Sequence, residues 1–315
     1  MKRREFIKVL GGALFAALGG AEAQTAPEIH RVGLLTPAAP SADNSPFGVP
    51  LVRGLAQHGY VQGRNLVFER RGAEGRLERL PRLVAELVAS NVDVIVTFGF
   101  PPALAAKQGT TIPVVAFAAG DPVATGLIDS LARLGGNLTG FSDEAAELSA
   151  KRMELFKEIA PQLRRVAMLW NADDLGMTLR YQASDVAAKT MGISVQALGV
   201  REPDDFEQAF AAMNREKPDA ILMVSDSLTT LNRKRVIDFA AAQRLPAIYE
   251  WEFIAREGGL MSYSMDLDES FERVAALIDR ILKGAKPAEL PCEQPTHFHF
   301  VLNLKTAKAL GITLS

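Results

Sequence analysis

The amino-acid sequence predicts an α/β protein made of two doubly wound lobes that follow each other along the chain. Short apolar, β-branched runs alternate with amphipathic helical patterns, and this alternation favours parallel sheets covered by helices on both faces. The alternation is interrupted once, by the glycine-rich stretch 133–143, and then resumes. A chain of 315 residues has room for two cores of ordinary size.

The first series carries four predicted strands and four predicted helices. The strands are expected at 30–36, 65–71, 92–99 and 112–118, and the helices at 47–58, 77–90, 101–108 and 122–133. Most of these strands are apolar runs, as expected for a strand that is buried on both faces. The stretch 133–143 then predicts a linker or a strand that passes between the lobes.

The second series repeats the pattern and ends in a tail. Its strands are expected at 164–171, 193–200, 219–226, 245–250 and 259–264, and its helices near 145–160, 177–191, 204–214, 229–243 and 252–256. A further helix over 268–283 begins with Asp268 and Glu269, which suit the positive end of a helix dipole. The tail adds an extended segment (297–304) and a short helix (304–310), and it is long enough to cross back between the lobes.

Composition excludes several classes of function. Apolar residues make up 48% of the chain and charged residues 23%, which is the balance of a globular protein. The formal net charge is −2, so the chain lacks the basic surface that nucleic-acid binding requires. The single cysteine, Cys292, excludes an internal disulfide framework and any multi-cysteine metal site.

The first 23 residues resemble a secretory signal. Basic residues open the chain, an apolar stretch runs from Val9 to Ala21, and Ala21-Glu22-Ala23 is a small-x-small cleavage site. The apolar stretch is too short for a comfortable membrane span. Arg3-Arg4 followed by Phe-Ile-Lys indicates the twin-arginine export route. We therefore expect an exported, periplasmic bacterial protein; a retained N-terminal anchor is the alternative.

Catalytic and nucleotide-binding motifs are missing from the sequence. The stretch VVAFAAGDPVATG (114–126) resembles a phosphate loop only superficially, because Gly120 and Gly126 are six residues apart and no lysine follows. A Gly-x-Ser-x-Gly nucleophile elbow is absent, and no nucleophile pairs with a base. His297 and His299 would share one face of the last extended segment, which favours an exposed strand face over a metal site. We expect no enzyme activity, no cofactor and no bound metal.

Polar and aromatic residues gather where the predicted strands end. In open α/β sheets, ligands bind outside the carboxyl ends of the strands. Those ends carry Thr36, the stretch from Thr97 to Pro101, Gly120 to Pro122, Asn171, Ser225 to Ser227, Tyr249 to Trp251, and Ser262 with Tyr263. Such a set suits a small zwitterionic or carboxylate solute. The alternative is that each residue only forms a turn or caps a helix, and for Asp121 before Pro122 capping is favoured.

Four stretches in order resemble the ABC-transporter substrate-binding protein family that includes the tryptophan- and phenylalanine-binding receptors. They are GLAQHGYVQGRNLVFERRGAEGRLERLPRLVAELV (54–88), VDVIVTFGFPPALAAKQGTTIPVVAFAAGDPVATGLIDSLARLGGNLTG (92–140), LPAIYEWEFIAREGGLMSYS (245–264) and RILKGAKPAELPCEQPTHFHFVLNLKTAKALG (280–311). Together with their spacing they cover nearly the whole chain after the signal. The chain departs from many relatives at Phe100, where they carry a small or polar residue, and Phe117 and Trp251 add aromatic bulk.

The resemblance implies a type I periplasmic-binding-protein fold, in which two Rossmann-like lobes joined by three crossovers close over a solute. The crossovers are expected at 137–143, 262–268 and 287–297. The first lobe would then comprise 29–140 and 265–287, and the second 141–264 and 288–315. The implied partners are a small-molecule solute and the membrane subunits of an ABC permease, and we expect a monomer.

The resemblance also places a ligand site in the cleft between the lobes. The candidate residues are Thr36, Thr97, Gly99, Phe100, Pro101, Asp121, Asn171, Ser225, Asp226, Tyr249, Glu250 and Tyr263. Asp226 is expected to bind an ammonium group, and Thr97 with the backbone before helix 101–108 to bind a carboxylate. The expected solute is an amino acid or an aromatic or carboxylate molecule. The competing function is a sensory module that signals to a membrane receptor or kinase.

Overall fold

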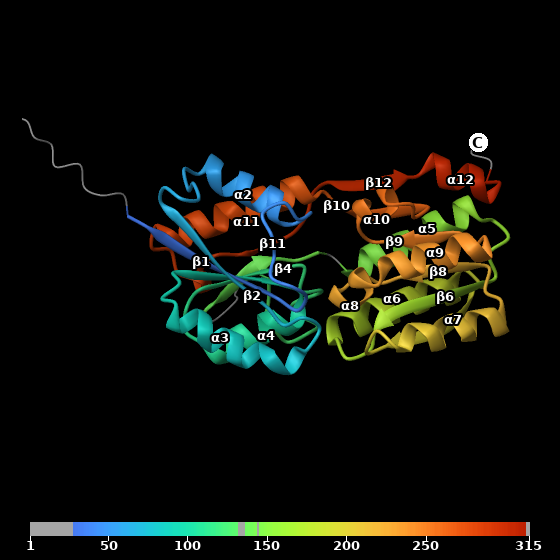
Figure 1. Cartoon of the computed structure of the whole chain (residues 1–315), viewed down its shortest axis with the longest axis horizontal. Coiled ribbons are helices and arrows are strands. Elements are labelled where there is room, and N and C mark those ends of the chain that lie inside the picture. Colours follow the sequence, from blue (N-terminus) through green and yellow to red (C-terminus); the bar gives the residue numbers. More distant parts are fainter. Residues whose placement is uncertain (1–27, 132–135, 144, 313–315) are drawn as a thin grey trace, which may run out of the picture.

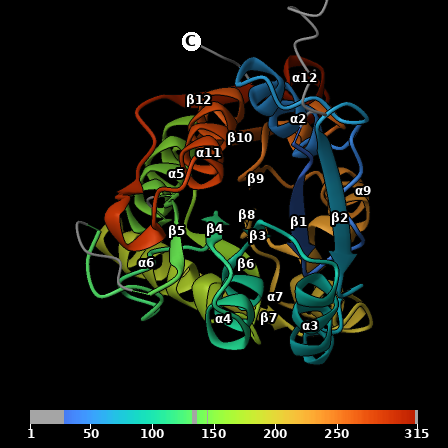
Figure 2. The same cartoon turned by 90° about the vertical axis from the view of Figure 1, so that its left-hand side faces the viewer.

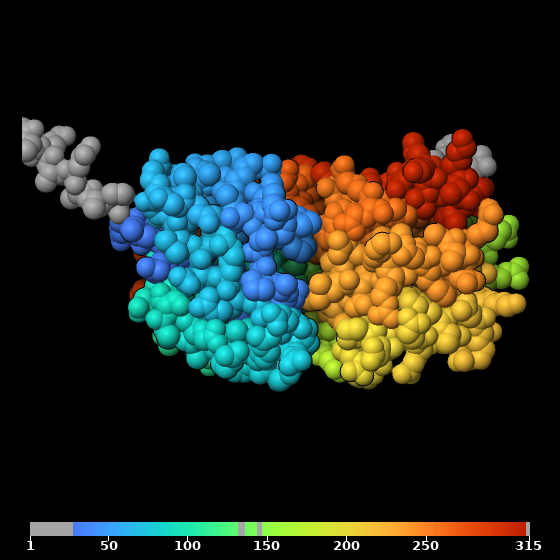
Figure 3. All heavy atoms as spheres, viewed as in Figure 1, coloured from blue at the N-terminus to red at the C-terminus, as the bar shows by residue number. Residues whose placement is uncertain are grey.

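A computed structural model describes residues 28–131, 136–143 and 145–312, and it shows two α/β lobes side by side (Figure 1). The predicted signal, 1–23, lies outside the described residues. In the space-filling view the blue-to-cyan atoms of the first lobe meet the yellow-to-orange atoms of the second along one boundary (Figure 3). The α/β class predicted from the alternating pattern is confirmed.

The sheet of the first lobe has the strand order β11-β5-β4-β3-β1-β2, and every neighbouring pair is parallel. Its strands are β1 (His30–Thr36), β2 (Leu66–Gly72), β3 (Val94–Phe98), β4 (Val114–Phe117), β5 (Leu138–Phe141) and β11 (Cys292–Glu293). Its helices are α2 (Gly48–Gln57), α3 (Leu80–Ala89), α4 (Phe100–Gly109) and α11 (Leu267–Leu282). Figure 2 shows α2 and α11 on one face of this sheet and α3 and α4 on the other. Because both faces are covered, the central strands β3 and β4 are buried along their length.

The sheet of the second lobe has the order β12-β10-β9-β8-β6-β7, and only its edge strand β12 is antiparallel. Its strands are β6 (Arg165–Asn171), β7 (Ser194–Val200), β8 (Ala220–Met223), β9 (Ala247–Tyr249), β10 (Met261–Met265) and β12 (Phe298–Leu302). Its helices are α5 (Ala145–Ile159), α6 (Leu175–Thr190), α7 (Asp205–Glu216), α8 (Ser227–Leu231), α9 (Arg233–Gln243), α10 (Glu252–Arg256) and α12 (Leu304–Leu310).

The chain passes between the lobes three times. The first crossover follows β5, the second passes through Asp266 between β10 and α11, and the third runs over 294–297 between β11 and β12. The backbone N–H of Ser142 donates to the carbonyl of Glu293 (2.8 Å), and that of Asp266 donates to the carbonyl of His297 (2.9 Å). These two bonds hold the three crossovers side by side.

Two expectations are corrected by the structure. The helix expected over 122–133 is not formed, since the described residues 122–131 run through turns. The Asp121 carboxylate caps one turn, and Gly126 then takes a left-handed φ of 72°, which ends it. The tail was expected to join the second lobe from residue 288, but β11 pairs with β5 in the first sheet. The return to the second lobe therefore comes only after Glu293.

One apolar core crosses the boundary between the lobes. Phe47, which precedes α2, packs against Phe117 and Phe271 in its own lobe and against Trp251 in the other, at ring distances of 6.3, 6.1 and 5.3 Å. The same continuous cluster contains β1 and β3 residues from the first lobe and β6 and β8 residues from the second. The lobes are therefore in direct apolar contact, and this contact forms one wall of the site described next.

Candidate functional site

A cavity of about 140 Å³ lies between the lobes at the carboxyl ends of both sheets. It opens toward a wider polar cleft of about 960 Å³ that shares Asp174, Asp226 and Ser227 with it. The cavity is lined by Pro37, Ala38, Phe47, Phe98, Gly99, Phe117 and Ala118 from the first lobe, and by Asp174, Met177, Arg180, Ser225, Asp226, Ser227, Thr230, Leu231 and Trp251 from the second.

The first lobe contributes an apolar wall. Phe98 and Phe117 are the last residues of the neighbouring parallel strands β3 and β4, and their rings meet edge to face at 6.2 Å. Phe47 lies over both rings and faces Trp251 edge to face across the cavity boundary. Ala118, directly after β4, has a left-handed φ of 53°, which is uncommon for a residue other than glycine. The result is an aromatic surface at the ends of two strands.

The second lobe contributes two carboxylates at helix starts. Asp174 is the N-cap of α6, where its side chain accepts a hydrogen bond from the Met177 backbone N–H (3.3 Å). Asp226 is the N-cap of α8, and it accepts from the Thr229 backbone N–H (2.9 Å) and from the Asn171 amide (2.6 Å). Each acid therefore has a capping role, which favours aspartate at these positions even without a ligand.

Behind the cavity lies a buried network of two guanidinium groups and two carboxylates. Arg180 on α6 pairs with Asp143 of the first crossover and with Glu250 after β9 (2.8 Å). Arg152 on α5 pairs with the other oxygen of Glu250 (3.0 Å) and donates to the Tyr263 carbonyl (2.8 Å). Each of these charged side chains is at most 5% exposed. The network thus joins the first crossover to the floor of the cavity.

Burial dominates the protonation behaviour of these groups. Burial, followed by the nearby charge of Asp226, raises the pKa of Asp174 to about 7. Burial also raises the pKa of Asp226, although hydrogen bonds from Thr229 and Asn171 act in the opposite direction. Burial opposes the charge of Arg180, but the carboxylates of Asp143 and Glu250 outweigh it and raise its pKa. The guanidinium stays charged, whereas Asp174 can change its charge near neutral pH.

The lobes also approach each other closely beside the cavity, at two glycines. A Cβ on Gly120, which follows β4, would lie 3.5 Å from the Cα of Gly176 on α6. A Cβ on Gly176 would lie 3.3 Å from the Cβ of Phe100 and 3.6 Å from the carbonyl oxygen of Ala119. Two backbones can meet here because neither residue carries a side chain.

The structure brings five of the twelve predicted site residues to the cavity or its support. Gly99, Ser225 and Asp226 line the cavity itself. Asn171 reaches it through its bond to Asp226, and Glu250 supports it by holding Arg180 and by accepting from the Ser225 backbone N–H (3.1 Å). All five stand at the carboxyl ends of strands, where the topology predicted a site.

The other seven predicted residues lie outside the lining of the cavity. Thr36 donates a hydrogen bond to the carbonyl of Ala39, and Thr97 and Tyr249 are buried in their strands. Phe100 packs in the core of the first lobe, and Pro101 lies within the first turn of α4. Asp121 caps an exposed turn, and the Tyr263 ring stacks on the Phe298 ring at 6.0 Å. We therefore leave these seven out of the site proposed below.

Sequence reasoning missed Phe47, Asp174 and Arg180 as lining residues. Phe47 precedes a helix rather than following a strand, and Asp174 and Arg180 belong to α6, beyond the strand ends considered. A signal for Asp174 was present, because a solitary Asp before an amphipathic helix is a typical N-cap. Nothing local in the sequence shows that Arg180, five residues into a helix, is buried.

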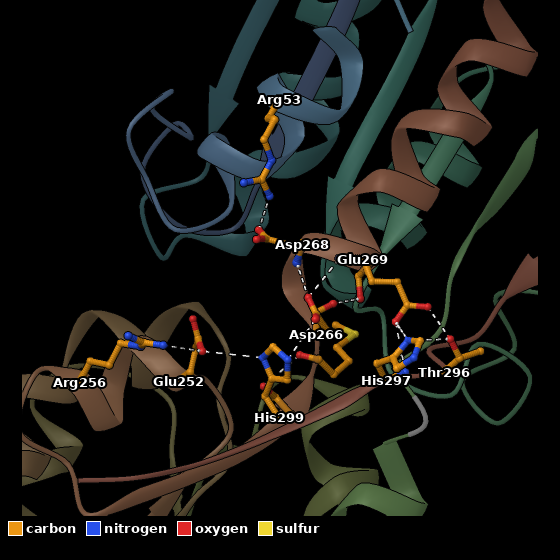
Figure 4. Close-up of polar contacts among 12 residues, drawn as sticks. Arg53, Glu252, Arg256, Asp266, Asp268, Glu269, Thr296, His297 and His299 are labelled. Atoms are coloured by element: carbon orange, nitrogen blue, oxygen red, sulfur yellow. Dashed lines mark hydrogen bonds and ion pairs between the residues drawn. The ribbon is translucent and has the colours of Figure 1, made fainter. Parts of the chain in front are cut away.

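His297 and His299 contact carboxylates at the crossovers (Figure 4). The Nδ1 atom of His297 lies 2.9 Å from Glu269, and Nε2 of His299 lies 3.0 Å from Asp266. Burial acts to raise the pKa of Glu269, but the hydrogen bonds from Thr296 and His297 outweigh burial and lower this pKa. The two histidines therefore link β12 and the third crossover to the start of α11. Within the described residues, no group of three or more potential metal ligands is found.

The two-lobed fold with a lined cavity between the lobes is typical of proteins that bind a small molecule between two lobes. Residues 39–315 match the model of the ABC transporter substrate binding protein family, and the chain belongs to that family. Proteins of this family bind small-molecule solutes and work with transporter permeases, and the relatives matched here are binding proteins rather than enzymes. None of the helices in the described part of the chain has the length and apolar character needed to cross a membrane.

Individual relatives agree with this class. A tyrosine-binding protein from Clostridioides difficile is 25% identical over 274 residues, which are 87% of this chain and 78% of the relative. A solved conserved domain protein from Vibrio cholerae is 26% identical with a TM-score of 0.84, covering 91% of this chain and 96% of that one. A Streptococcus pneumonia ABC domain in complex with L-Trp is 24% identical with a TM-score of 0.80 and the same coverage, so it supports the fold. The predicted type I periplasmic-binding-protein fold is thereby confirmed.

Proposed function

We propose that this chain is the solute receptor of an ABC importer and binds a small amino-acid-like or aromatic molecule in the 140 Å³ cavity. The observation that carries the proposal is the lining of this cavity, which both lobes supply. Aromatic rings stand on one side, and buried charged and hydroxyl groups stand on the other. Small-molecule sites combine apolar walls with a few convergent polar groups in this way. Binding without turnover is part of the proposal, and its support is that the matched family and the matched relative are binding proteins.

Hinge closure is the proposed mechanism. A solute that contacts Phe98 on one lobe and Asp226 on the other gains both sets of contacts only when the lobes are together. It therefore stabilises the closed arrangement by its differential contacts. The short crossovers, joined by the Ser142–Glu293 and Asp266–His297 backbone bonds, are the natural hinge. The protein is proposed to act as a monomer.

Export through the twin-arginine route to the periplasm is part of the same proposal. The support is the Arg3-Arg4 pair, the short apolar stretch and the Ala21-Glu22-Ala23 motif. Replacing both arginines by lysine in the full chain should leave the uncleaved protein inside the cell, as fractionation and the mass of the protein would show. Unchanged export of this variant would contradict the twin-arginine route and leave solute binding untouched.

Native mass spectrometry of the purified protein tests solute binding most directly. We expect a bound small molecule that disappears on mild unfolding, and thermal-shift screening of amino acids and aromatic acids and amines should then give a rise in melting temperature. Asp226→Asn should weaken the response, whereas Asp121→Asn, outside the cavity, should not. A protein that holds no small molecule and responds to none of these compounds would contradict the proposed function.

A further inference from the structure

The helix start beside the apolar wall of the cavity offers few donors to a carboxylate. The start of α4 is the helix end nearest the apolar wall, and a helix start usually offers free N–H groups to an anion. Here Pro101 and Pro102 have no N–H, and the N–H of the N-cap residue Gly99 donates to the Phe117 carbonyl (2.9 Å). The helix start that was expected to bind a carboxylate is therefore depleted of donors.

The guanidinium group that lines the cavity is already paired with carboxylates of the protein. Of the described side chains that line the cavity, Arg180 is the one cation. Its two terminal nitrogens pair with Asp143 and Glu250, which are as deeply buried as the arginine itself. A ligand carboxylate at Arg180 would have to compete with two carboxylates that are already in place, and it would add a third negative charge to them.

The carboxylates, in contrast, are in excess. Asp143, Asp174, Asp226 and Glu250 form one buried cluster, and among the described residues the cations paired with it are Arg152 and Arg180. Asp174 and Asp226 line the cavity, and their nearest bonds come from neutral donors: backbone N–H groups, the Asn171 amide and the Thr229 hydroxyl. A positive charge entering the cavity would neutralise part of this surplus.

The remaining lining suits the other end of such a ligand. Phe47, Phe98, Phe117 and Trp251 supply aromatic faces, which attract organic cations as well as apolar groups. A volume of about 140 Å³ matches the roughly 150 Å³ of an apolar cavity that takes up one benzene molecule. Within the described part of the chain, the buried Ser225 hydroxyl at this cavity has no hydrogen-bond partner, so it is free to accept from a ligand N–H.

We propose that the solute is a small organic amine with a single ring or compact apolar body and no carboxylate group. Its ammonium binds between Asp174, Asp226 and the Ser225 hydroxyl, and its apolar body lies against the four aromatic rings. This inference rests on the proposed function and narrows its ligand from amino-acid-like and aromatic molecules in general to amines.

Isothermal titration of the ligand-stripped protein with three matched compounds tests the inference. The probes are 2-phenylethylamine, L-phenylalanine and 3-phenylpropionate, which share one ring and differ in their charged groups. At pH 8 we expect the amine to bind at least about tenfold more tightly than the amino acid, and the acid to show no heat of binding. Equal or tighter binding of phenylalanine or phenylpropionate would overturn the inference and leave the proposed function standing.

Charge-removing variants assign the effect to the two acids. Asp174→Asn and Asp226→Asn keep a good N-cap residue, so the helices should keep their starts while the charge is lost. Each should weaken amine binding by about tenfold or more, and Asp173→Asn, a neighbouring acid in the outer cleft, should leave it unchanged. Unaltered amine affinity in both cavity variants would also overturn the inference. If no probe binds, the amine inference is wrong, and the proposed function then depends on the native mass spectrum alone.

Discussion

The two walls of the cavity differ in kind, although the two lobes share one architecture. Every lining residue from the first lobe is apolar or a glycine, whereas all charged and hydroxyl groups come from the second. The second lobe also holds the buried network of Arg152, Arg180 and Glu250. The difference indicates a division of labour, in which the second lobe fixes the polar end of a solute and the first covers its apolar end.

The division has a local cause at the strand ends. In the first lobe, β3 and β4 end in Phe98 and Phe117, whose rings form the wall of the cavity. The helix that follows β3, α4, has prolines in its first turn, so it offers fewer N–H donors there. In the second lobe the neighbouring helices α6 and α8 each begin with an aspartate N-cap that faces the cavity. Because a parallel sheet brings all these ends to one edge, small changes after each strand decide the chemistry of a whole wall.

Removing the charge of Arg180 should destabilise the polar wall, and we expect it to cause the largest loss of stability among these predictions. In Arg180→Met the methionine fills the space of the apolar part of the arginine side chain, but Asp143 loses its ion pair with Arg180 and Glu250 keeps only its ion pair with Arg152. Breaking a buried pair in this way costs about 3–5 kcal/mol, so the free energy of unfolding in urea should fall by that order. Arg201→Met, which breaks an exposed pair with Asp173, should cost less than about 1 kcal/mol. Similar losses in both variants would show that the network is not a special feature of this wall.

The free energy of unfolding should depend on pH because the polar wall holds more buried carboxylates than cations. Burial and the charge of Asp226 raise the pKa of Asp174 from 3.8 to about 7 in the folded protein. Between these two pH values the folded state binds more protons than the unfolded state, so the free energy of unfolding falls as the pH rises. The stability that depends on protonated Asp174 is fully present below pH 4 and is lost as the pH rises through 7. At pH 8, Asp174→Asn should therefore be more stable than the unaltered protein, by about 4 kcal/mol, while at pH 4 the two should nearly match. An equal difference at both pH values would contradict a charge effect.

The fold could be predicted from the sequence because its signals are repeated along the chain. The strand expected at 30–36 matches β1 (His30–Thr36), for example, because its last five residues are buried and carry the apolar pattern of a covered strand. The failures have physical reasons. The turn 122–126 resembles a helix start, but Gly126 ends it after one turn, and β11 is only two residues long and too short to leave a pattern. The site was predicted only where it stands at strand ends, as at Asp226, because Phe47 and Arg180 reach it through tertiary packing.

Truncating Phe47 should weaken the apolar wall and the contact between the lobes. The Phe47 ring touches Phe98 and Phe117 on its own lobe and Trp251 on the other. Because the ring is only partly buried, Phe47→Ala should lower the free energy of unfolding by about 1–2 kcal/mol and solute affinity by about tenfold. Phe300→Ala removes an exposed ring far from the cavity and should change neither quantity noticeably. Loss of stability with unchanged affinity would mean that the ring only supports the core.

The smallest effect is expected where the two walls meet, at Gly120. Gly120→Ala places a methyl group about 3.5 Å from the Gly176 Cα on the other lobe, at a left-handed φ of 79°. Gly63→Ala is a matched control, because Gly63 has a φ of 80° with no neighbouring atom within 4 Å. Both variants should lose about 1 kcal/mol of stability to backbone strain. Only Gly120→Ala should also bind solute more weakly, by a few fold in titration calorimetry, because its methyl group tightens the contact that closure makes. Equal affinities in the two variants would show that the approach of the lobes at this point does not contribute to binding, and the division between the walls would then concern the cavity alone.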